Sequence, residues 1–338
     1  MGKTKIEWCD EVFNPITGCR SDCNYCYSDQ LAKRFSGDFR SNLRQKDKYR
    51  EEEGLYILDE MFMGENGKYV AFPFRFAPTF HRYRLGLLDE WIAGRNVYVG
   101  AVADMFGDWV PEKWITDVFD ACKASPHHNY MFLTKNPLRY LELKERGLLP
   151  EGNSFWYGTT ITNEKDPYFV CKAHKTFLCI EPIHGEFSKE KLQRDIFGKY
   201  HRPDWIIIGP ETGRRKGKIV PEFEWIKEIV LAADTAGVPV YMRNSLAQIV
   251  GEKNMRQDFP KELLEKRVGD NRSAIWHDAC QMCKKKMDKQ KMVSLSGKVK
   301  RRGKWKTIMH MCRECYVKWC KEIGIESYVE ELYEEKKL

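Results

Sequence analysis

The feature that most constrains the fold is a regular alternation of short apolar runs with helix-like segments. The apolar runs recur at spacings of about 22 to 33 residues, and each has the length of a buried strand. The predicted strands are 8–17, 96–103, 129–134, 155–161, 176–182, 205–209 and 238–243, and the helices between them are 85–94, 111–124, 136–147, 188–198 and 221–237. Strands that alternate with helices pair in parallel through right-handed crossovers. The sequence therefore predicts an α/β fold, with about seven strands in a full or partial (β/α) barrel.

The chain of 338 residues is predicted to contain two parts. Residues 1–250 form the barrel, with a β-hairpin inserted near 55–75, where two β-prone runs flank a Gly/Asn turn. Residues 270–338 are Lys-rich and form a separate small module that ends in a helix. The second part is too short for a large core, so a bound metal is expected to stabilise it.

Composition favours a soluble protein of the cytoplasm. The chain is 42% hydrophobic and 31% charged, and no apolar run approaches the roughly 18 residues that span a bilayer. The amino terminus lacks the apolar segment of a secretory signal. We therefore expect no membrane partner, and we expect thiols that stay reduced. In that setting, clustered cysteines indicate a metal or catalysis rather than disulfides.

Polar residues stand where the predicted strands end. They are Asp104, Thr134, Lys135, Glu181 and Glu211. In parallel barrels the carboxyl ends of the strands carry the chemistry, so these side chains are expected to share one site. A helix cap or a surface ion pair is the alternative for each of them.

Three cysteines, Cys19, Cys23 and Cys26, follow the first predicted strand at the same edge. Three thiolates leave one iron of a four-iron cluster open to another ligand. A structural zinc site needs a fourth ligand, which Cys9 is placed to supply. Three buried free thiols are the remaining alternative.

The spacing Cys-x3-Cys-x2-Cys, with an aromatic residue before the last cysteine, resembles that of the radical S-adenosylmethionine (SAM) superfamily. The segments "KIEWCDEVFNPITGC", "CNYCYSDQLAKRF", "VYVGAVADMF", "FLTKNPLR", "CIEPIHG", "IIIGPETG" and "AGVPVYMRN" resemble, in order, a phage-associated and largely uncharacterised branch of it. The resemblance covers residues 3–245 or thereabouts.

The resemblance implies a [4Fe–4S] cluster on the three cysteines, with SAM bound to the fourth iron. It also implies reductive cleavage of SAM to a 5′-deoxyadenosyl radical, with an electron donor such as flavodoxin or ferredoxin. Tyr25 is expected near the adenine, and Asp104 near the amino group of SAM. Thr134 and Lys135 are expected near its carboxylate or ribose, and Glu181 and Glu211 are further carboxylates for the cofactor or substrate.

A second cysteine set lies near the carboxyl end. The pairs Cys280–Cys283 and Cys312–Cys315 are two CxxC knuckles, and such knuckles can supply a tetrahedral zinc site. The residues between them predict a two-stranded β-ribbon with a basic turn, as in a zinc ribbon. An auxiliary iron–sulfur cluster and unligated thiols are the alternatives.

The net charge of +8 is concentrated near the same end, in "CKKKMDKQK" and "KVKRRGKWK". Basic residues interleaved with Trp305, Tyr316 and Trp319 favour a nucleic-acid partner, through phosphate contacts and base stacking. The predicted function is modification of a nucleic acid or nucleotide. The alternatives are a radical enzyme for a peptide or small molecule, and a non-catalytic nucleic-acid-binding protein with two structural zinc sites.

Overall fold

The structure, a computed structural model, describes residues 4, 6–91, 93–199, 201–212 and 217–266, with the backbone alone at 90, 292–298 and 305–312. The chain divides into two compact units, Met1–Arg267 and Val268–Leu338, and each is described by itself. Within the described residues, no helix has the length and apolar character needed to cross a membrane.

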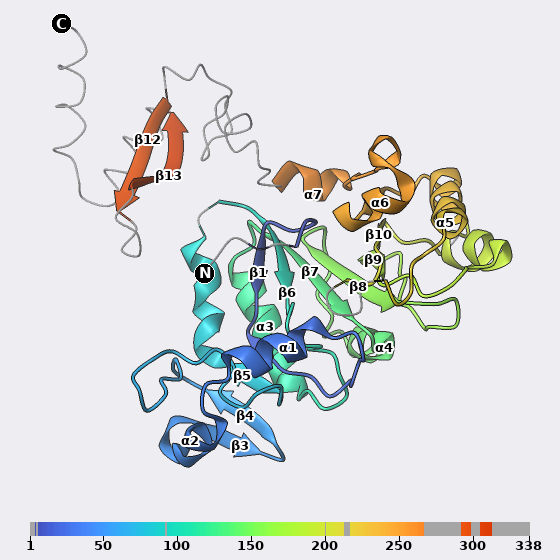
Figure 1. Ribbon diagram of the computed structural model, residues 1–338. Coiled ribbons are helices and arrows are strands. Elements are labelled where there is room, and N and C mark those ends of the chain that lie inside the picture. The colour runs from blue at the N-terminus through green and yellow to red at the C-terminus, as the bar shows by residue number, and fades with distance from the viewer. Residues whose placement is uncertain are drawn as a thin grey trace, which may run out of the picture. The chain divides into compact units, whose positions relative to one another are not determined.

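Seven strands form the main sheet of the first unit (Figure 1). They are β1 (Glu11–Phe13), β6 (Asn96–Val99), β7 (Asn129–Thr134), β8 (Phe155–Ile161), β9 (Lys175–Ile180), β10 (Trp205–Ile208) and β11 (Val240–Met242). Each strand pairs in parallel with the next in that order. The edge strands β1 and β11 do not pair with each other in the described structure, so the barrel is partial. The predicted α/β fold is confirmed in this open form.

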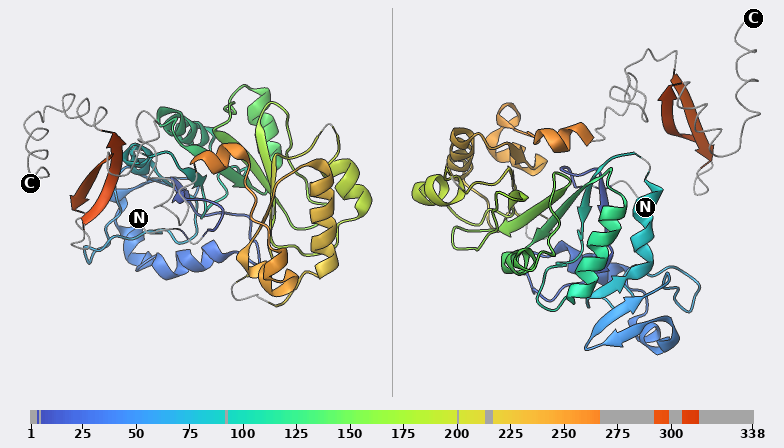
Figure 2. Two further views of the ribbon diagram at one scale, coloured as in Figure 1. Left: turned by 90° about the horizontal axis from the view of Figure 1, so that it is seen from above. Right: turned by 180° about the vertical axis from the view of Figure 1, so that it is seen from behind.

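Side chains alternate between the two faces of the sheet, as strand geometry requires. Val97 and Phe132 point outward, into a core shared with α3 (Glu112–Ala124) and α4 (Pro137–Glu145). Toward β11 the outer face packs against α5 (Phe223–Ala236), the gold helix on the outside in Figure 2. Burial of each large apolar side chain contributes roughly 1.5–3 kcal/mol, so this covered face stabilises the sheet.

The inner face is filled from the segment before β1. The ring centroid of Trp8 lies 4.7 Å from that of Tyr98 and 6.4 Å from that of Trp205, within one buried cluster. At the amino ends of the strands, the Asn96 side chain donates a hydrogen bond of 2.7 Å to the carbonyl of Leu263 in α7 (Lys261–Lys266). The inner face is thus packed toward the amino ends, and space remains at the carboxyl ends.

The predicted first strand over 8–17 divides into two strands. Its second part, β2 (Ile16–Thr17), leaves the main sheet and pairs with β5 (Thr79–His81). The break falls at Pro15, which has no backbone N–H to donate and whose carbonyl accepts from the backbone N–H of His81 at 2.7 Å. The prediction of one continuous strand was wrong for this reason.

A small second sheet holds the insertion. Its strands are β2, β5, β4 (Leu55–Leu58) and β3 (Arg50–Glu52), in that order. Strands β3 and β4 form an antiparallel hairpin. Farther along the segment where a hairpin was predicted, an isolated antiparallel bridge joins Met63 to Tyr69.

The other helical segments differ in length from those predicted. The segment predicted as a helix at 85–94 is a 3-10 helix over Arg82–Glu90, and that at 188–198 is a short π-helical turn over Lys191–Ile196. The remaining elements of the unit are α1 (Tyr27–Phe35), α2 (Phe39–Arg44), α6 (Ala247–Val250) and 3-10 turns at Lys46–Lys48, Asn244–Leu246 and Glu252–Asn254.

The second unit contains an antiparallel pair, β12 (Met292–Lys298) and β13 (Trp305–Cys312). The register runs from Met292 opposite Cys312 to Lys298 opposite Trp305. The predicted two-stranded ribbon is present. The side chains of the four predicted zinc ligands, Cys280, Cys283, Cys312 and Cys315, lie outside the described residues.

Acid is expected to destabilise the first unit through two buried histidines, His81 and His128. Burial lowers the pKa of His81 well below its usual value, and burial lowers that of His128 to about 4. Below about pH 6.5 the unfolded chain therefore binds protons that the folded chain does not. The free energy of unfolding consequently decreases as the pH is lowered. For each histidine the slope approaches about 1.4 kcal/mol per pH unit, and for His128 it persists to about pH 4.

Urea unfolding at several pH values between 7 and 4.5 measures this slope. His128→Gln is expected to flatten the slope, because it removes the group that the unfolded chain protonates and the folded chain does not. Carboxyl groups common to both proteins cancel in the comparison. Equal slopes in the unmodified chain and in His128→Gln would contradict the prediction.

Candidate functional site

A cavity of about 490 Å³ lies at the carboxyl ends of the strands in the first unit. Every residue predicted for the cofactor site lines it: Cys19, Cys23, Tyr25, Cys26, Asp104, Thr134, Lys135, Glu181 and Glu211. These residues lie at the end of β7 or in the loops that follow β2, β6, β7, β9 and β10. The structure thus brings the predicted residues together, while their roles toward a cofactor stay predictions.

The cysteine loop is fixed at its start by Gly18. The backbone N–H of Gly18 donates to the carbonyl of Val102 at 3.1 Å, and that of Cys19 donates to the carbonyl of Phe76 at 3.0 Å. Gly18 has a φ of +85°, and a Cβ there would stand 2.2 Å from the carbonyl oxygen of Ala77. Only glycine fits this conformation and this close approach, so Gly18 sets the position at which Cys19 enters the cavity.

The three thiols lie in a turn that leads into α1. The Cys19 sulfur accepts a hydrogen bond from the backbone N–H of Ser21 at 3.4 Å, and it lies 3.3 Å from the Ser21 hydroxyl. Cys26 is the N-cap of α1, with no side-chain hydrogen bond to the helix. The Cys26 sulfur is therefore not used to cap the helix.

Electrostatics couple Cys23 to its neighbours. Burial raises the pKa of the Cys23 thiol, the Lys135 ammonium lowers it, and the thiols of Cys19 and Cys26 raise it further. Burial also raises the pKa of Cys19. Three thiolates crowded in one half-buried turn are therefore unfavourable by themselves, and a cationic metal group would relieve that cost.

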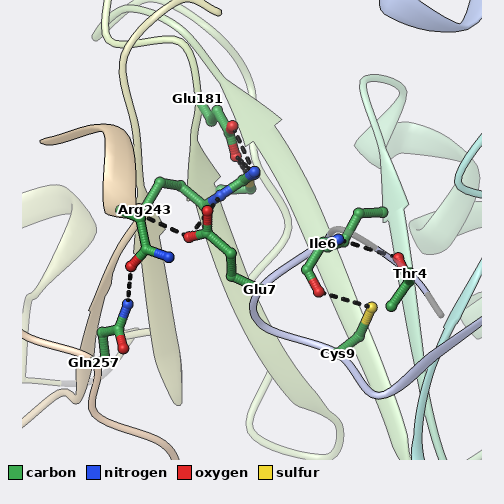
Figure 3. Close-up of polar contacts among 9 residues, drawn as sticks. Thr4, Ile6, Glu7, Cys9, Glu181, Arg243 and Gln257 are labelled. Carbon is green, nitrogen blue, oxygen red and sulfur yellow. Dashed lines mark hydrogen bonds and ion pairs between the residues drawn. The ribbon is translucent and has the colours of Figure 1, made fainter. Parts of the chain in front are cut away.

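Cys9, the candidate fourth zinc ligand, lies in the core instead of the cavity. Its thiol donates to the carbonyl of Ile6 at 3.9 Å (Figure 3), and burial raises its pKa. Among the described residues, no three His, Cys, Asp or Glu side chains are arranged to hold one metal ion. A four-coordinate zinc built on the cysteine trio and Cys9 is therefore not supported by this geometry.

Tyr25 and Lys135 form one wall of the cavity. The Lys135 ammonium donates a hydrogen bond to the Tyr25 hydroxyl and also stands 4.8 Å from the centroid of the Tyr25 ring. The other ring contact of Tyr25 is edge-on to His184, at 5.5 Å between centroids. The aromatic ring before the third cysteine is thereby held against a cation.

Asp104 joins the ends of β6 and β7. Its carboxylate accepts from the Thr134 hydroxyl at 2.7 Å, the backbone N–H of Lys135 at 2.9 Å and that of Phe106 at 3.1 Å. Burial raises the pKa of this carboxyl, and the three hydrogen bonds oppose that shift. With three acceptor positions used within the protein, Asp104 chiefly positions Thr134 and Lys135, and about one position remains for a ligand.

Arg243, which follows β11, was not predicted as a site residue. Its Nη1 donates to both carboxylate oxygens of Glu181, at 2.8 and 3.0 Å, and its Nε donates to Glu7 at 3.3 Å (Figure 3). Burial raises the pKa of Glu181, and the charge of Arg243 opposes this. The only sequence signal for Arg243 is its place at the end of a predicted strand, the same signal that identified Glu181.

Aromatic residues of the cavity wall were also missed. Trp8, Tyr27 and Tyr98 line the cavity, and the Tyr27 hydroxyl donates to the carbonyl of Ala101 at 2.6 Å. In the sequence Trp8 and Tyr98 fall within predicted strands, which suggests core positions, and Tyr27 only follows the last cysteine of the trio. Glu211, by contrast, was predicted, and it is only 4% exposed where it lines the cavity.

Comparison with known proteins gives one family and one solved structure. A family model described as "Protein of unknown function (DUF5131)" matches residues 3–299. A search of curated proteins gave no match. A spore photoproduct lyase mutant with bound AdoMet and dinucleoside spore photoproduct is 11% identical, with 96% of this chain and 74% of that chain covered and a TM-score of 0.34. Because the family model spans most of the 338 residues, the chain belongs to the DUF5131 family.

Proposed function

We propose that the chain is a radical SAM enzyme. The observation that carries the proposal is the placement of Cys19, Cys23 and Cys26 together on one cavity at the carboxyl edge of an open parallel sheet. Cys179 also lines the cavity, but it lies within β9 and outside the cysteine loop. The loop itself supplies three thiols, which suits a four-iron cluster with one open iron. Cys9 packs in the core, which speaks against the alternative of a structural zinc site there.

The residues fit such a cluster and its cofactor. When bound, a [4Fe–4S] cluster on the three cysteines supplies the electron that cleaves SAM to methionine and a 5′-deoxyadenosyl radical. Tyr25 and Lys135 form the wall beside the trio, and Asp104 keeps Thr134 and Lys135 in place. The buried carboxyl group of Glu211 lines the cavity, where it is placed to meet the cationic groups of SAM.

For the substrate we propose a nucleic acid or nucleotide. Support comes from the net charge of +8 and from the basic and aromatic residues between 284 and 319. In this proposal Cys280, Cys283, Cys312 and Cys315 bind zinc, a flavodoxin or ferredoxin donates the electron, and the enzyme acts in the cytoplasm. A peptide or small-molecule substrate is the second candidate, favoured if the basic segment only docks a partner.

The test is the metal content and SAM chemistry of protein purified without oxygen. We expect about four iron atoms with sulfide and about one zinc per chain. With dithionite and SAM, 5′-deoxyadenosine should form. Zinc without iron after cluster reconstitution, and no 5′-deoxyadenosine, would overturn the proposal and favour a non-catalytic binding protein.

A further inference from the structure

Arg243 is clamped between two carboxylates at the wall of the cavity. Glu181 accepts two hydrogen bonds from Nη1, and Glu7 accepts one from Nε (Figure 3). Glu7 also accepts from the backbone N–H of Asn244 at 2.8 Å. Arg243 and Glu181 are each 19% exposed at the side chain and line the cavity. These contacts fix the plane and direction of the guanidinium.

The clamp leaves one side of the guanidinium for a ligand. Within the described part of the chain, Nη2 of Arg243 makes no hydrogen bond, and it is not among the buried polar atoms that lack a partner. Glu181 accepts from Arg243 and, at 3.8 Å, from the Cys179 thiol, so about one of its four acceptor positions remains. A donor and an acceptor thus stand side by side in fixed geometry.

The charge of this group selects against a bare anion. The charge of Arg243 is already matched by the Glu181 carboxylate, which accepts two hydrogen bonds from Nη1. A phosphate at Nη2 would lie beside that carboxylate and would be repelled by it. An uncharged ligand that carries a hydrogen-bond acceptor next to a donor could accept from Nη2 of Arg243 and donate to the Glu181 carboxylate at the same time.

One aromatic ring of the wall is open to a flat ligand. Tyr27 lines the same cavity and is 55% exposed, whereas Trp8 and Tyr98 are buried against each other. Aromatic side chains stack on bases whatever their sequence, and a base turned out of its strand is read by hydrogen bonds to its edge.

We propose that Arg243 and Glu181 read the hydrogen-bonding edge of a nucleobase that enters the cavity, while the phosphates of the substrate remain outside it. This inference rests on the proposed function, and it names the part of the substrate that the site recognises.

The test uses cluster-reconstituted protein with SAM and no reductant, so that binding is measured without turnover. The probes are short fluorescent single strands that differ only in one central base, with fluorescence anisotropy as the readout. We expect the affinities for the four bases to differ by about tenfold or more. Arg243→Lys keeps the charge but loses the planar fork, and should bring the four affinities within about twofold.

Two further variants complete the experiment. Arg256→Lys is the matched control, because Arg256 pairs with Asp234 and Asp258 and does not line the cavity. It should keep the base preference. Glu181→Gln replaces an acceptor by an amide of the same shape, and should change which base binds best. Circular dichroism checks that each variant folds.

Several outcomes would overturn the inference. Equal affinity for all four bases in the unmodified protein would mean that only the backbone is bound. No strand binding, with 5′-deoxyadenosine formation stimulated by a peptide, would assign the site to the other substrate class. Parallel loss of SAM binding and base preference in Arg243→Lys would assign Arg243 to the cofactor. Absence of 5′-deoxyadenosine with base preference intact would instead count against the proposed function alone.

Discussion

Cys26→Ala is expected to lose its iron and to form no detectable 5′-deoxyadenosine. Cys26 is one of the three thiols that the cysteine loop brings to the cavity. The fourth cysteine of the lining, Cys179, is buried within β9 with its thiol on Glu181, and Cys9 does not line the cavity, so among the described cysteines neither is placed to replace Cys26. A cluster with two protein ligands would be released or degraded. Changes that merely disturb the surroundings of a metal ligand cost about 10- to 100-fold, so removal of a ligand should exceed this. Iron, sulfide and 5′-deoxyadenosine per chain are the measurements.

Cys9→Ala is the control, because the two changes remove the same group from the same segment of the chain. It should retain iron and SAM cleavage, although loss of buried volume lowers stability somewhat. If Cys9→Ala lost its metal as fully as Cys26→Ala, a four-cysteine site would replace the proposed cluster. If Cys26→Ala kept its iron, the assignment of the trio would be wrong.

The main sheet could be predicted because its signal is local. Runs such as "NYMFLT" and "WIII" are apolar on both faces, and only strands buried on both sides need that pattern. The site residues followed from the same reasoning. The carboxyl ends of parallel strands lie at the same edge of the sheet. Asp104, Lys135 and Glu181 therefore line one cavity, although they are far apart in sequence.

What the sequence could not supply depends on contacts between distant segments. Glu7 and Arg243 are 236 residues apart, and neither has a local pattern that indicates a partner. Trp8 fills the inner face next to Tyr98, a packing choice that periodicity does not encode. The departure of β2 toward β5 likewise depends on a sheet whose other strands lie more than 30 residues later. Each of these features is set by tertiary packing.

Gly18→Ala is expected to unfold or displace the cysteine loop. The new Cβ would meet three backbone atoms of Phe76 and Ala77 within 2.6 Å, and alanine is also strained at a φ of +85°. Strain alone costs about 1–3 kcal/mol, and the clash with backbone adds to it. We therefore expect the free energy of unfolding to fall by more than about 3 kcal/mol, a large share of the roughly 5–15 kcal/mol of an ordinary domain. The loss should be read by urea unfolding, with iron measured after reconstitution.

Gly67→Ala separates the two causes of this loss. Gly67 also has a positive φ, of +68°, but a Cβ there meets no atom within 4 Å. The free energy of unfolding should therefore fall only by the backbone strain of about 1–3 kcal/mol. The variant should also keep its iron, because Gly67 is remote from the cysteine loop in sequence and does not line the cavity. The difference between the two variants measures the close approach of Gly18 to Ala77. Equal losses, with iron retained in both, would show that the loop can shift to admit the methyl group, and that Gly18 does not fix the entry of Cys19 into the cavity.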